Sequence, residues 1–193
     1  MFMNTQRGAS LIEVLVTMVI LAFGLLGAAG LQARLQLADM EAYQRAQALI
    51  LADDIASRIA TNRAQAAAYV TGAANPLGTG VVCATPAAGA ALQQFDSAQW
   101  CNALQGAAEI IGGVRTGAML GARGCVEILG AAANKEYLVT VAWQGVAPIS
   151  APPASIACGL NLYNGAVTST SSNCTADRCR RAVTTVVRIA TLT

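Results

Sequence analysis

The chain of 193 residues is poor in charged residues, 11%, and rich in hydrophobic ones, 55%, whereas about 25% charged residues is usual for a globular protein. Its net charge of +2 gives no electrostatic basis for binding nucleic acid. The sequence contains no histidine, which excludes Ser-His-Asp and Cys-His nucleophilic sites and every zinc site that uses histidine. The length suits one packed domain with a long additional helix.

The first element that the sequence predicts is a membrane-spanning helix. Residues 1–8 form a short polar leader, and residues 9–31 follow as an apolar run of 23 residues. At about 1.5 Å per residue, such a run is long enough to cross a bilayer as a helix. Glu13 is the one ionisable residue within it. A carboxylate at the centre of a membrane helix costs about 2.5–3.5 kcal/mol, and less near an end.

Three interpretations of this N-terminus are open. The first is a secretory signal peptide, for which the small residues 27–29 offer a cleavage site before Gly30. The second is a plain anchor that holds a periplasmic domain at the membrane. Neither of these needs the carboxylate of Glu13. The third takes account of it through the residues that surround Gly8.

The residues after Gly8 resemble the type IV prepilin signal. Gly8 is followed by ASLIEVLV, a stretch that begins at Ala9 and contains Glu13 as its fifth residue. The resemblance implies that a prepilin peptidase cuts between Gly8 and Ala9 on the cytoplasmic side and methylates the new amine of Ala9. Glu13 then occupies the fifth mature position, where this family has its glutamate. The first mature residue is usually phenylalanine in the family, and it is alanine in this chain.

The same resemblance implies an assembly role for Glu13. A carboxylate surrounded by lipid is costly when it is alone and tolerated when it is paired. In a filament, the N-terminal amine of one subunit can approach Glu13 of its neighbour, so that both charges are neutralised together. The alternative is that Glu13 lies at the lipid headgroup boundary, where it is solvated and inert.

Helical patterning continues beyond the membrane segment as an amphipathic arm over residues 32–71. Apolar residues recur there every three or four positions and predict one buried stripe. We expect a single helix from Ala9 to Tyr69, about 90 Å long, that stops before Gly72. The stripe consists of Leu31, Leu35, Ala38, Ala42, Ala46, Leu49, Ala52, Ala56 and Ile59.

Residues 72–193 are predicted to form a disulfide-bonded globular head. The alternation of apolar and polar residues predicts antiparallel strands with a turn at Asn134-Lys135. The fold class is therefore α+β, with a long N-terminal helix packed on a small antiparallel sheet, and it resembles the pilin fold. The predicted elements are a loop over 72–94, a helix over 96–111, strands over 125–129, 136–143 and 182–192, and a long loop over 145–181.

Six cysteines lie after the apolar run, and their even number in an exported segment predicts disulfides. A metal site of four thiolates is the alternative, but no Cys-x-x-Cys pair is present, and we expect neither a metal nor a cofactor. Six cysteines allow fifteen connectivities. We expect Cys83 to pair with Cys101 and Cys158 with Cys179, which leaves Cys125 for Cys174. Each bond should contribute about 2–4 kcal/mol.

Later phrases of the sequence resemble the PilV-type minor pilins of type IV pili. They are VAWQG at residues 141–145, followed by Cys158 and by CRR at residues 179–181 before a terminal strand. This resemblance implies a subunit that joins other minor pilins and the major pilin in a tip-located complex that initiates the pilus, with a tip adhesin as a further candidate partner. The subunit would lie in the inner membrane with its head in the periplasm, and then in the pilus on the cell surface.

Two alternatives to the minor pilin remain open. A type II secretion pseudopilin shares the N-terminal motif, and a membrane-anchored periplasmic binding protein would share the anchor. We do not expect an enzyme, because the sequence contains no Ser-x-x-Lys motif, P-loop or metal-ligand spacing. Arg178, Arg180 and Arg181 form the only basic cluster. We interpret it as a solvated entry to the last strand, with a partner-binding patch as the alternative.

Overall fold

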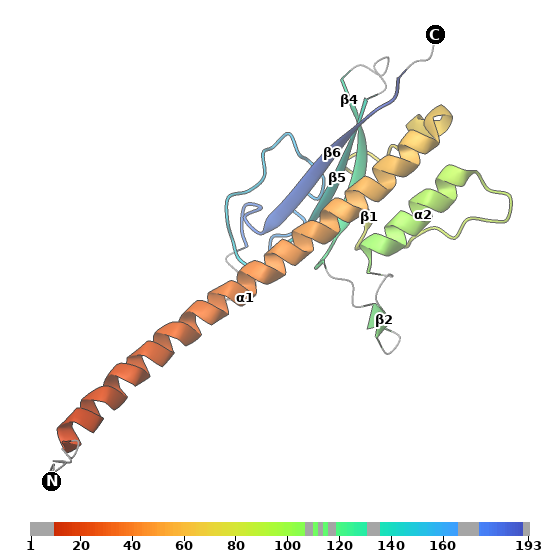
Figure 1. The fold of residues 1–193 in the computed structure, drawn as a ribbon. Helices are drawn as coiled ribbons and strands as arrows, with labels where there is room; N and C mark the ends of the chain where they lie inside the picture. Colours follow the sequence, from red (N-terminus) through yellow and green to blue (C-terminus); the bar gives the residue numbers. More distant parts are fainter. Residues whose placement is uncertain are drawn as a thin grey trace. The chain divides into compact units, whose positions relative to one another are not determined.

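The computed structural model describes residues 10–106, 119–130, 136–165 and 174–190, and the backbone of 110–111 and 114–115. The chain divides into two compact units, Met1–Met40 and Glu41–Thr193. Helix α1, Leu11–Thr61, begins in the first unit and ends in the second (Figure 1). The first unit is helical with exposed apolar side chains, and the second contains the hydrophobic core.

In the first unit, α1 is apolar and unburied. It contains a stretch that is long and apolar enough to cross a membrane, and no part of that stretch is covered by the protein. Side chains such as Leu11, Phe23 and Leu25 are more than two-thirds exposed. Such a surface is unfavourable in water and favourable in lipid or against other apolar helices. A helix with the length and hydropathy expected of the membrane-spanning segment is thus present in the structure.

In the second unit, one face of α1 packs against the sheet. Ala48, Ala52, Ile55 and Ile59 recur every three or four residues and are fully buried. They belong to the core cluster together with the strand residues that face the helix. The two alanines bring the helix backbone close to the sheet, because a methyl group occupies little of the space between the layers.

The predicted apolar stripe was correct at Ala52 and Ile59 and wrong at the start of the arm. Ala42, Ala46 and Leu49 are exposed. The face that packs against the sheet is instead displaced around the helix. Alanine occurs on every face of this arm, so the sequence period did not distinguish between neighbouring faces.

The helix also ends earlier than expected. Asn62 adopts φ −97° and ψ 47°, and a short 3₁₀ helix, η1, follows at Arg63–Tyr69. The side-chain amide of Asn62 donates a hydrogen bond to the hydroxyl of Tyr69 at 3.1 Å. This bond holds the bend and turns the chain back toward the head, so the expected single helix to Tyr69 is wrong. Gly72 has φ +73°, a conformation that favours glycine.

The head contains a four-stranded antiparallel sheet in the order β1-β4-β5-β6. Figure 1 shows α1 lying across this sheet with helix α2, Leu92–Leu104, beside it. The strands are β1 at Leu77–Gly78, β4 at Arg123–Leu129, β5 at Glu136–Gln144 and β6 at Arg180–Arg188. A separate two-stranded sheet pairs β2, Ile110–Ile111, with β3, Val114–Arg115.

The three predicted strands correspond to β4, β5 and β6, so the α+β fold class is confirmed. The last strand starts two residues earlier than expected and ends at Arg188. The helix predicted over 96–111 is wrong at both ends, because α2 covers Leu92–Leu104 and Ile110–Ile111 lie in a strand. The predicted turn at Asn134-Lys135 lies outside the described residues.

Helix α2 is attached to the sheet through Trp100. Its indole nitrogen donates a hydrogen bond to the carbonyl oxygen of Leu51 on α1 at 2.8 Å. Its ring lies over Gly124 of β4, where an added Cβ would come within 2.3 Å of the ring. Gly124 is therefore required for the close packing of α2 on the sheet, since no side chain fits between them.

Candidate functional site

The candidate assembly residue Glu13 lies in the first turn of α1. The turn is closed by backbone hydrogen bonds from Glu13 and Val14 to the carbonyl oxygen of Ser10, at 3.0 and 3.3 Å. A carboxylate near a helix N-terminus is stabilised by the helix dipole. Gly8 and Ala9, the predicted cleavage and methylation positions, lie outside the described residues.

The surroundings of Glu13 are apolar and uncovered. Leu11, Ile12, Leu15 and Val16 are all at least 48% exposed. Glu13 makes no ion pair with any residue that the structure describes. This part of α1 thus presents one carboxylate within an apolar surface, an arrangement that another apolar helix with a cation could complete.

Three disulfides hold the head together. Cys83 pairs with Cys101, as predicted, and joins the loop after β1 to α2. The other two predicted pairings are wrong, because Cys125 pairs with Cys158 and Cys174 pairs with Cys179. All six cysteines are bonded.

The Cys125–Cys158 bond explains how the long loop after β5 folds. Cys125 lies opposite Thr140 in the sheet, on the face away from α1. The sulfur of Cys158 lies 3.9 Å from the carbonyl oxygen of Thr140. The hydroxyl of Tyr163, from the same loop, lies 2.9 Å from the carbonyl oxygen of Ala142. The loop therefore folds back over this face of β5 and covers part of it.

Of the basic cluster, Arg178 is exposed as the sequence suggested, whereas Arg180 and Arg181, at the start of β6, are engaged within the fold. Arg180 is only 1% exposed and makes an ion pair with Asp177 at 3.1 Å. It also donates to the carbonyl oxygens of Ile156 and Cys158 at 2.6 and 3.1 Å. Arg180 thus fixes the folded-back loop from inside, because its donors satisfy carbonyl groups that would otherwise lack partners.

Arg181 is fixed to α1. Its guanidinium makes an ion pair with Glu41 at 3.1 Å and donates to the carbonyl oxygen of Ala147 at 2.6 Å. The two charged residues are 140 positions apart in the sequence. No local pattern pointed to this contact, and only the packing of α1 on the sheet brings the two side chains together.

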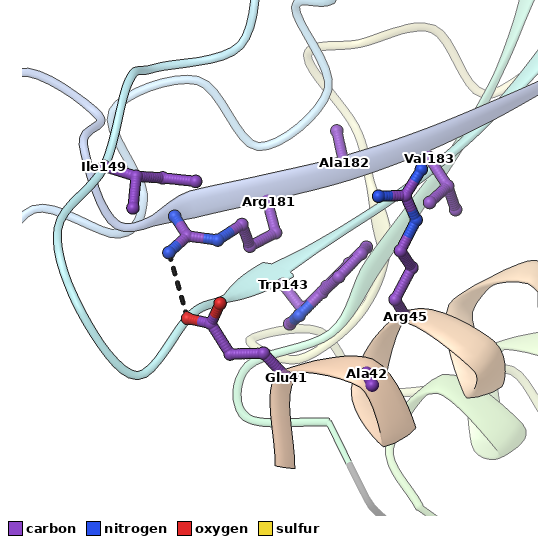
Figure 2. Close-up of a pocket in the computed structure, with 8 residues that line it drawn as sticks. All are labelled: Glu41, Ala42, Arg45, Trp143, Ile149, Arg181, Ala182 and Val183. Atoms are coloured by element: carbon purple, nitrogen blue, oxygen red, sulfur yellow. Dashed lines mark hydrogen bonds and ion pairs between the residues drawn. The ribbon is translucent and has the colours of Figure 1, made fainter. Parts of the chain in front are cut away.

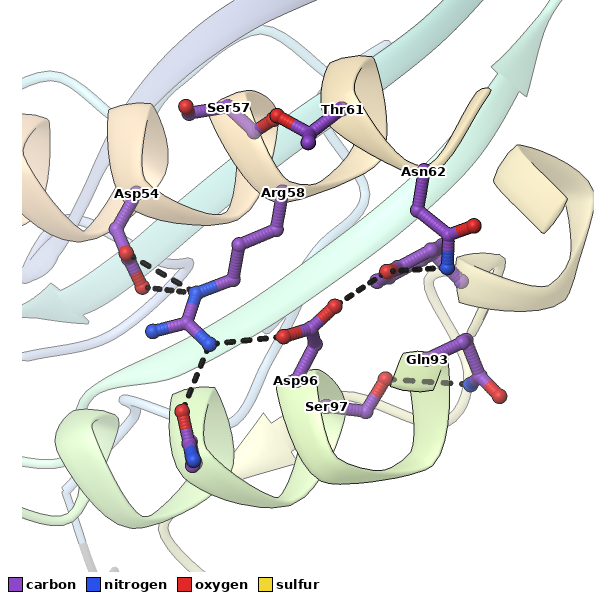
Figure 3. A network of polar contacts seen from close by, with 10 residues as sticks. Asp54, Ser57, Arg58, Thr61, Asn62, Gln93, Asp96 and Ser97 are labelled. Carbon is purple, nitrogen blue, oxygen red and sulfur yellow. Dashed lines mark hydrogen bonds and ion pairs between the residues drawn. The ribbon is translucent and has the colours of Figure 1, made fainter. Parts of the chain in front are cut away.

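A second polar cluster joins the end of α1 to α2, as Figure 3 shows. Arg58 makes ion pairs with Asp54 at 3.0 Å and with Asp96 at 2.9 Å. Asp96 also accepts a hydrogen bond from the hydroxyl of Tyr69. Burial and this hydrogen bond to Asp96 raise the pKa of Tyr69 to about 12. Asp54 and Arg58 lie one helical turn apart, whereas the links to Asp96 connect residues that are far apart in the sequence.

Within the described part of the chain, no group of three or more histidine, cysteine, aspartate or glutamate residues is arranged to hold a metal ion. The cysteines are engaged with one another. The acidic residues with buried side chains, Asp96 and Asp177, are each paired with an arginine. Asp96 and Asp177 are therefore engaged in holding the fold, whereas one carboxylate oxygen of Glu127 is buried without a hydrogen-bond partner among the described residues.

Residues 3–29 match the family described as the prokaryotic N-terminal methylation motif. No curated protein and no solved structure matches the chain. The matched segment contains Gly8, Ala9 and Glu13 and supports a type IV pilin-like family. The motif implies processing by a prepilin peptidase and assembly with other pilins, and with the apolar helix it indicates membrane anchoring.

Proposed function

We propose that this chain is a minor pilin of a type IV pilus. It is cut between Gly8 and Ala9, methylated at Ala9, held in the inner membrane by residues 9–31 with its head in the periplasm, and then incorporated into the pilus. The observation that supports this most directly is the methylation motif over residues 3–29. The motif extends into an uncovered apolar helix that carries Glu13 in its first turn.

In this proposal Glu13 aligns the subunit with its neighbour. An unpaired carboxylate in an apolar environment is unfavourable by several kcal/mol, and a partner of opposite charge offsets that cost. The methylated amine of Ala9 on an adjoining subunit supplies such a charge. Pairing then favours departure from the bilayer into the filament, and it selects one axial position for the helix.

The head contributes binding surfaces and no catalysis. It joins other minor pilins and the major pilin in a tip-located complex that initiates assembly, with a tip adhesin as a further partner. Support comes from the interior of the head, where Asp96 and Asp177 are both committed to ion pairs inside the fold. Groups so engaged hold structure and are not free to transfer protons to a substrate.

The first test is mass spectrometry of the mature N-terminus in the bacterium that encodes the chain. We expect a methylated chain that begins at Ala9. A chain that begins near Gly30 would show a signal peptide, and a chain that keeps residues 1–8 would show a plain anchor. Either result contradicts the proposal.

The second test is a Glu13→Val variant. We expect it to be cut after Gly8 as in the wild type, but to be reduced at least tenfold in sheared fibres, because its helix lacks the charge that pairs with the neighbour. Asp53→Val, at an exposed acidic position on the same helix, serves as the control. Normal incorporation of Glu13→Val would show that the carboxylate is inert.

Deletion of the gene separates the pilus from a type II secretion system, since the motif is common to both. The proposal expects loss or reduction of surface pili with unchanged protein secretion. The opposite pattern would assign the chain to a pseudopilus.

A further inference from the structure

The head contains a pocket of about 390 Å³ between α1 and the edge of the sheet, within the range of roughly 300–1,000 Å³ that ligand pockets have. Figure 2 shows the residues that line it. They come from α1, from the end of β5, from the loop after it, and from β6: Glu41, Ala42, Arg45, Trp143, Ile149, Arg181, Ala182 and Val183.

One charged pair in this pocket is already satisfied. Arg181 binds Glu41, and it also donates to the carbonyl oxygens of Ala147 and Arg178 at 2.6 and 3.1 Å. Gly145 makes room for this arrangement, because a Cβ there would lie 2.6 Å from the guanidinium carbon of Arg181. Arg181 thus pairs with one carboxylate oxygen of Glu41, and among the described residues no ion pair joins Glu41 to Arg45.

Arg45 is the unsatisfied charge of the pocket. It lies one helical turn after Glu41 and extends from α1 toward β6 in Figure 2. It makes no hydrogen bond or ion pair with any described residue, whereas Arg181 makes several. With Arg181 balanced by Glu41, the pocket carries one net positive charge, which comes from Arg45.

The remaining walls of the pocket are apolar. Trp143 is almost fully buried, Val183 belongs to the core cluster, and Ile149 at the rim is 49% exposed. A guanidinium beside aromatic and aliphatic walls suits a carboxylate with apolar groups next to it, because the charge and the walls can be contacted together.

We propose that this pocket receives an acidic side chain, flanked by apolar residues, of another subunit of the filament. The proposal rests on the proposed function and names the surface by which the head binds its neighbour. The carboxylate pairs with Arg45, and the apolar residues beside it lie against Ile149 at the rim. A protein segment is favoured over a small anion because the guanidinium of Arg45 and the apolar walls lie side by side. One short peptide segment can therefore contact both.

The test is photo-crosslinking of the full-length chain in the bacterium that encodes it. p-Benzoylphenylalanine replaces Ile149, whose exposed position tolerates a larger side chain. We expect a crosslink to another pilin-type subunit, mapped by mass spectrometry to within a few residues of an aspartate or glutamate. Arg45→Glu should reduce its yield roughly tenfold or more, since a repelling charge replaces an attracting one, and Arg45→Lys should retain most of it.

Arg63→Glu is the matched control, because Arg63 is an exposed arginine of the same unit outside the pocket. It should leave the crosslink unchanged. Intact disulfides in every variant show that the head has folded. When the mapped acidic residue of the partner is replaced by arginine, the Arg45→Glu variant should form the crosslink again, because the two charges are again opposite.

The pocket proposal is overturned by a crosslink that does not depend on Arg45. It is also overturned by a crosslink that maps to phospholipid, to a second copy of this chain or to a segment without an acidic residue. So does the absence of any crosslink. N-terminal processing and incorporation into sheared fibres are scored in the same strains. If the wild type is processed and incorporated while the crosslink ignores Arg45, the pocket proposal fails and the minor pilin proposal stands.

Discussion

Asp96 is the residue through which three helical segments of the head are connected. Its carboxylate accepts from Arg58 on α1 and from Tyr69 at the end of η1, while its own backbone belongs to α2. Because charged partners strengthen hydrogen bonds in a poorly solvated site, this arrangement makes the bend at Asn62 a defined structure. The ionisation of Tyr69 is correspondingly unfavourable.

The raised pKa of Tyr69 predicts a loss of stability in alkali. At a pH below 10, its ordinary pKa, the hydroxyl keeps its proton in the folded and the unfolded chain. As the pH rises from 10 to about 12, the unfolded chain loses the proton first, so the free energy of unfolding falls. A shift of this size corresponds to about 2–3 kcal/mol.

Urea unfolding of the detergent-solubilised protein at pH 8 and at pH 11.5 measures this effect. Tyr69→Phe should be less stable than the wild type at pH 8, because Asp96 loses a donor, and should lose less of its stability in alkali. Tyr43→Phe, at an exposed tyrosine, is the control. Equal alkaline losses in wild type and Tyr69→Phe would refute the explanation.

At the scale of elements, the disulfides stabilise the head to different extents. Cys125–Cys158 joins residues 33 positions apart, and Cys174–Cys179 joins residues 5 apart. In the chain-entropy description, a longer closed loop restricts the unfolded chain more. The longer bond also holds the folded-back loop against β5, where Cys158 is fully buried.

We therefore expect the double substitution of Cys125 and Cys158 by serine to lower the free energy of unfolding more than the same substitution of Cys174 and Cys179. The difference in loop entropy alone is about 1.7 kcal/mol. Denaturant unfolding of the two variants measures it. Equal losses, or a larger loss for the shorter bond, would contradict this ranking.

A helix or strand could be predicted from the sequence where its pattern of apolar residues fits only one structure. The alternation from Tyr137 to Trp143 identified β5, and the apolar run that contains Glu13 identified the exposed apolar part of α1. The buried face of the arm was not identified, because alanines on several faces give similar periodicity. Disulfide pairing and the Glu41–Arg181 contact depend on which surfaces meet after folding, and spacing along the chain does not encode this.

At the scale of the whole molecule, the boundary between the compact units lies at Met40 and Glu41. The compact unit that contains the sheet therefore also includes the last part of α1. Ile55, Ile59 and Tyr69 are all nearly fully buried in its core. At about 1.5–3 kcal/mol for each large side chain, their burial contributes about 5–9 kcal/mol, as much as the entire stability of many domains.

Two truncations test this boundary. A chain that begins at Glu41 should be a soluble monomer with three disulfides and cooperative thermal unfolding, because its core is complete. A chain that begins at Gly72 should aggregate or unfold, because the sheet loses the helix that covers it. Size-exclusion chromatography and circular dichroism measure both. A folded, monomeric product from Gly72 would show that the helix is dispensable.

The position of β6 as the last element of the described chain has a consequence for biogenesis. β5 pairs with β4 on one side and with β6 on the other, and more than thirty residues separate β5 from β6 in the sequence. During synthesis from the N-terminus, β5 thus has an open edge until Arg180–Arg188 emerge. An open edge pairs readily with any extended strand nearby. Synthesis of this chain therefore ends with an interval in which the open edge of β5 can pair with a strand of another protein.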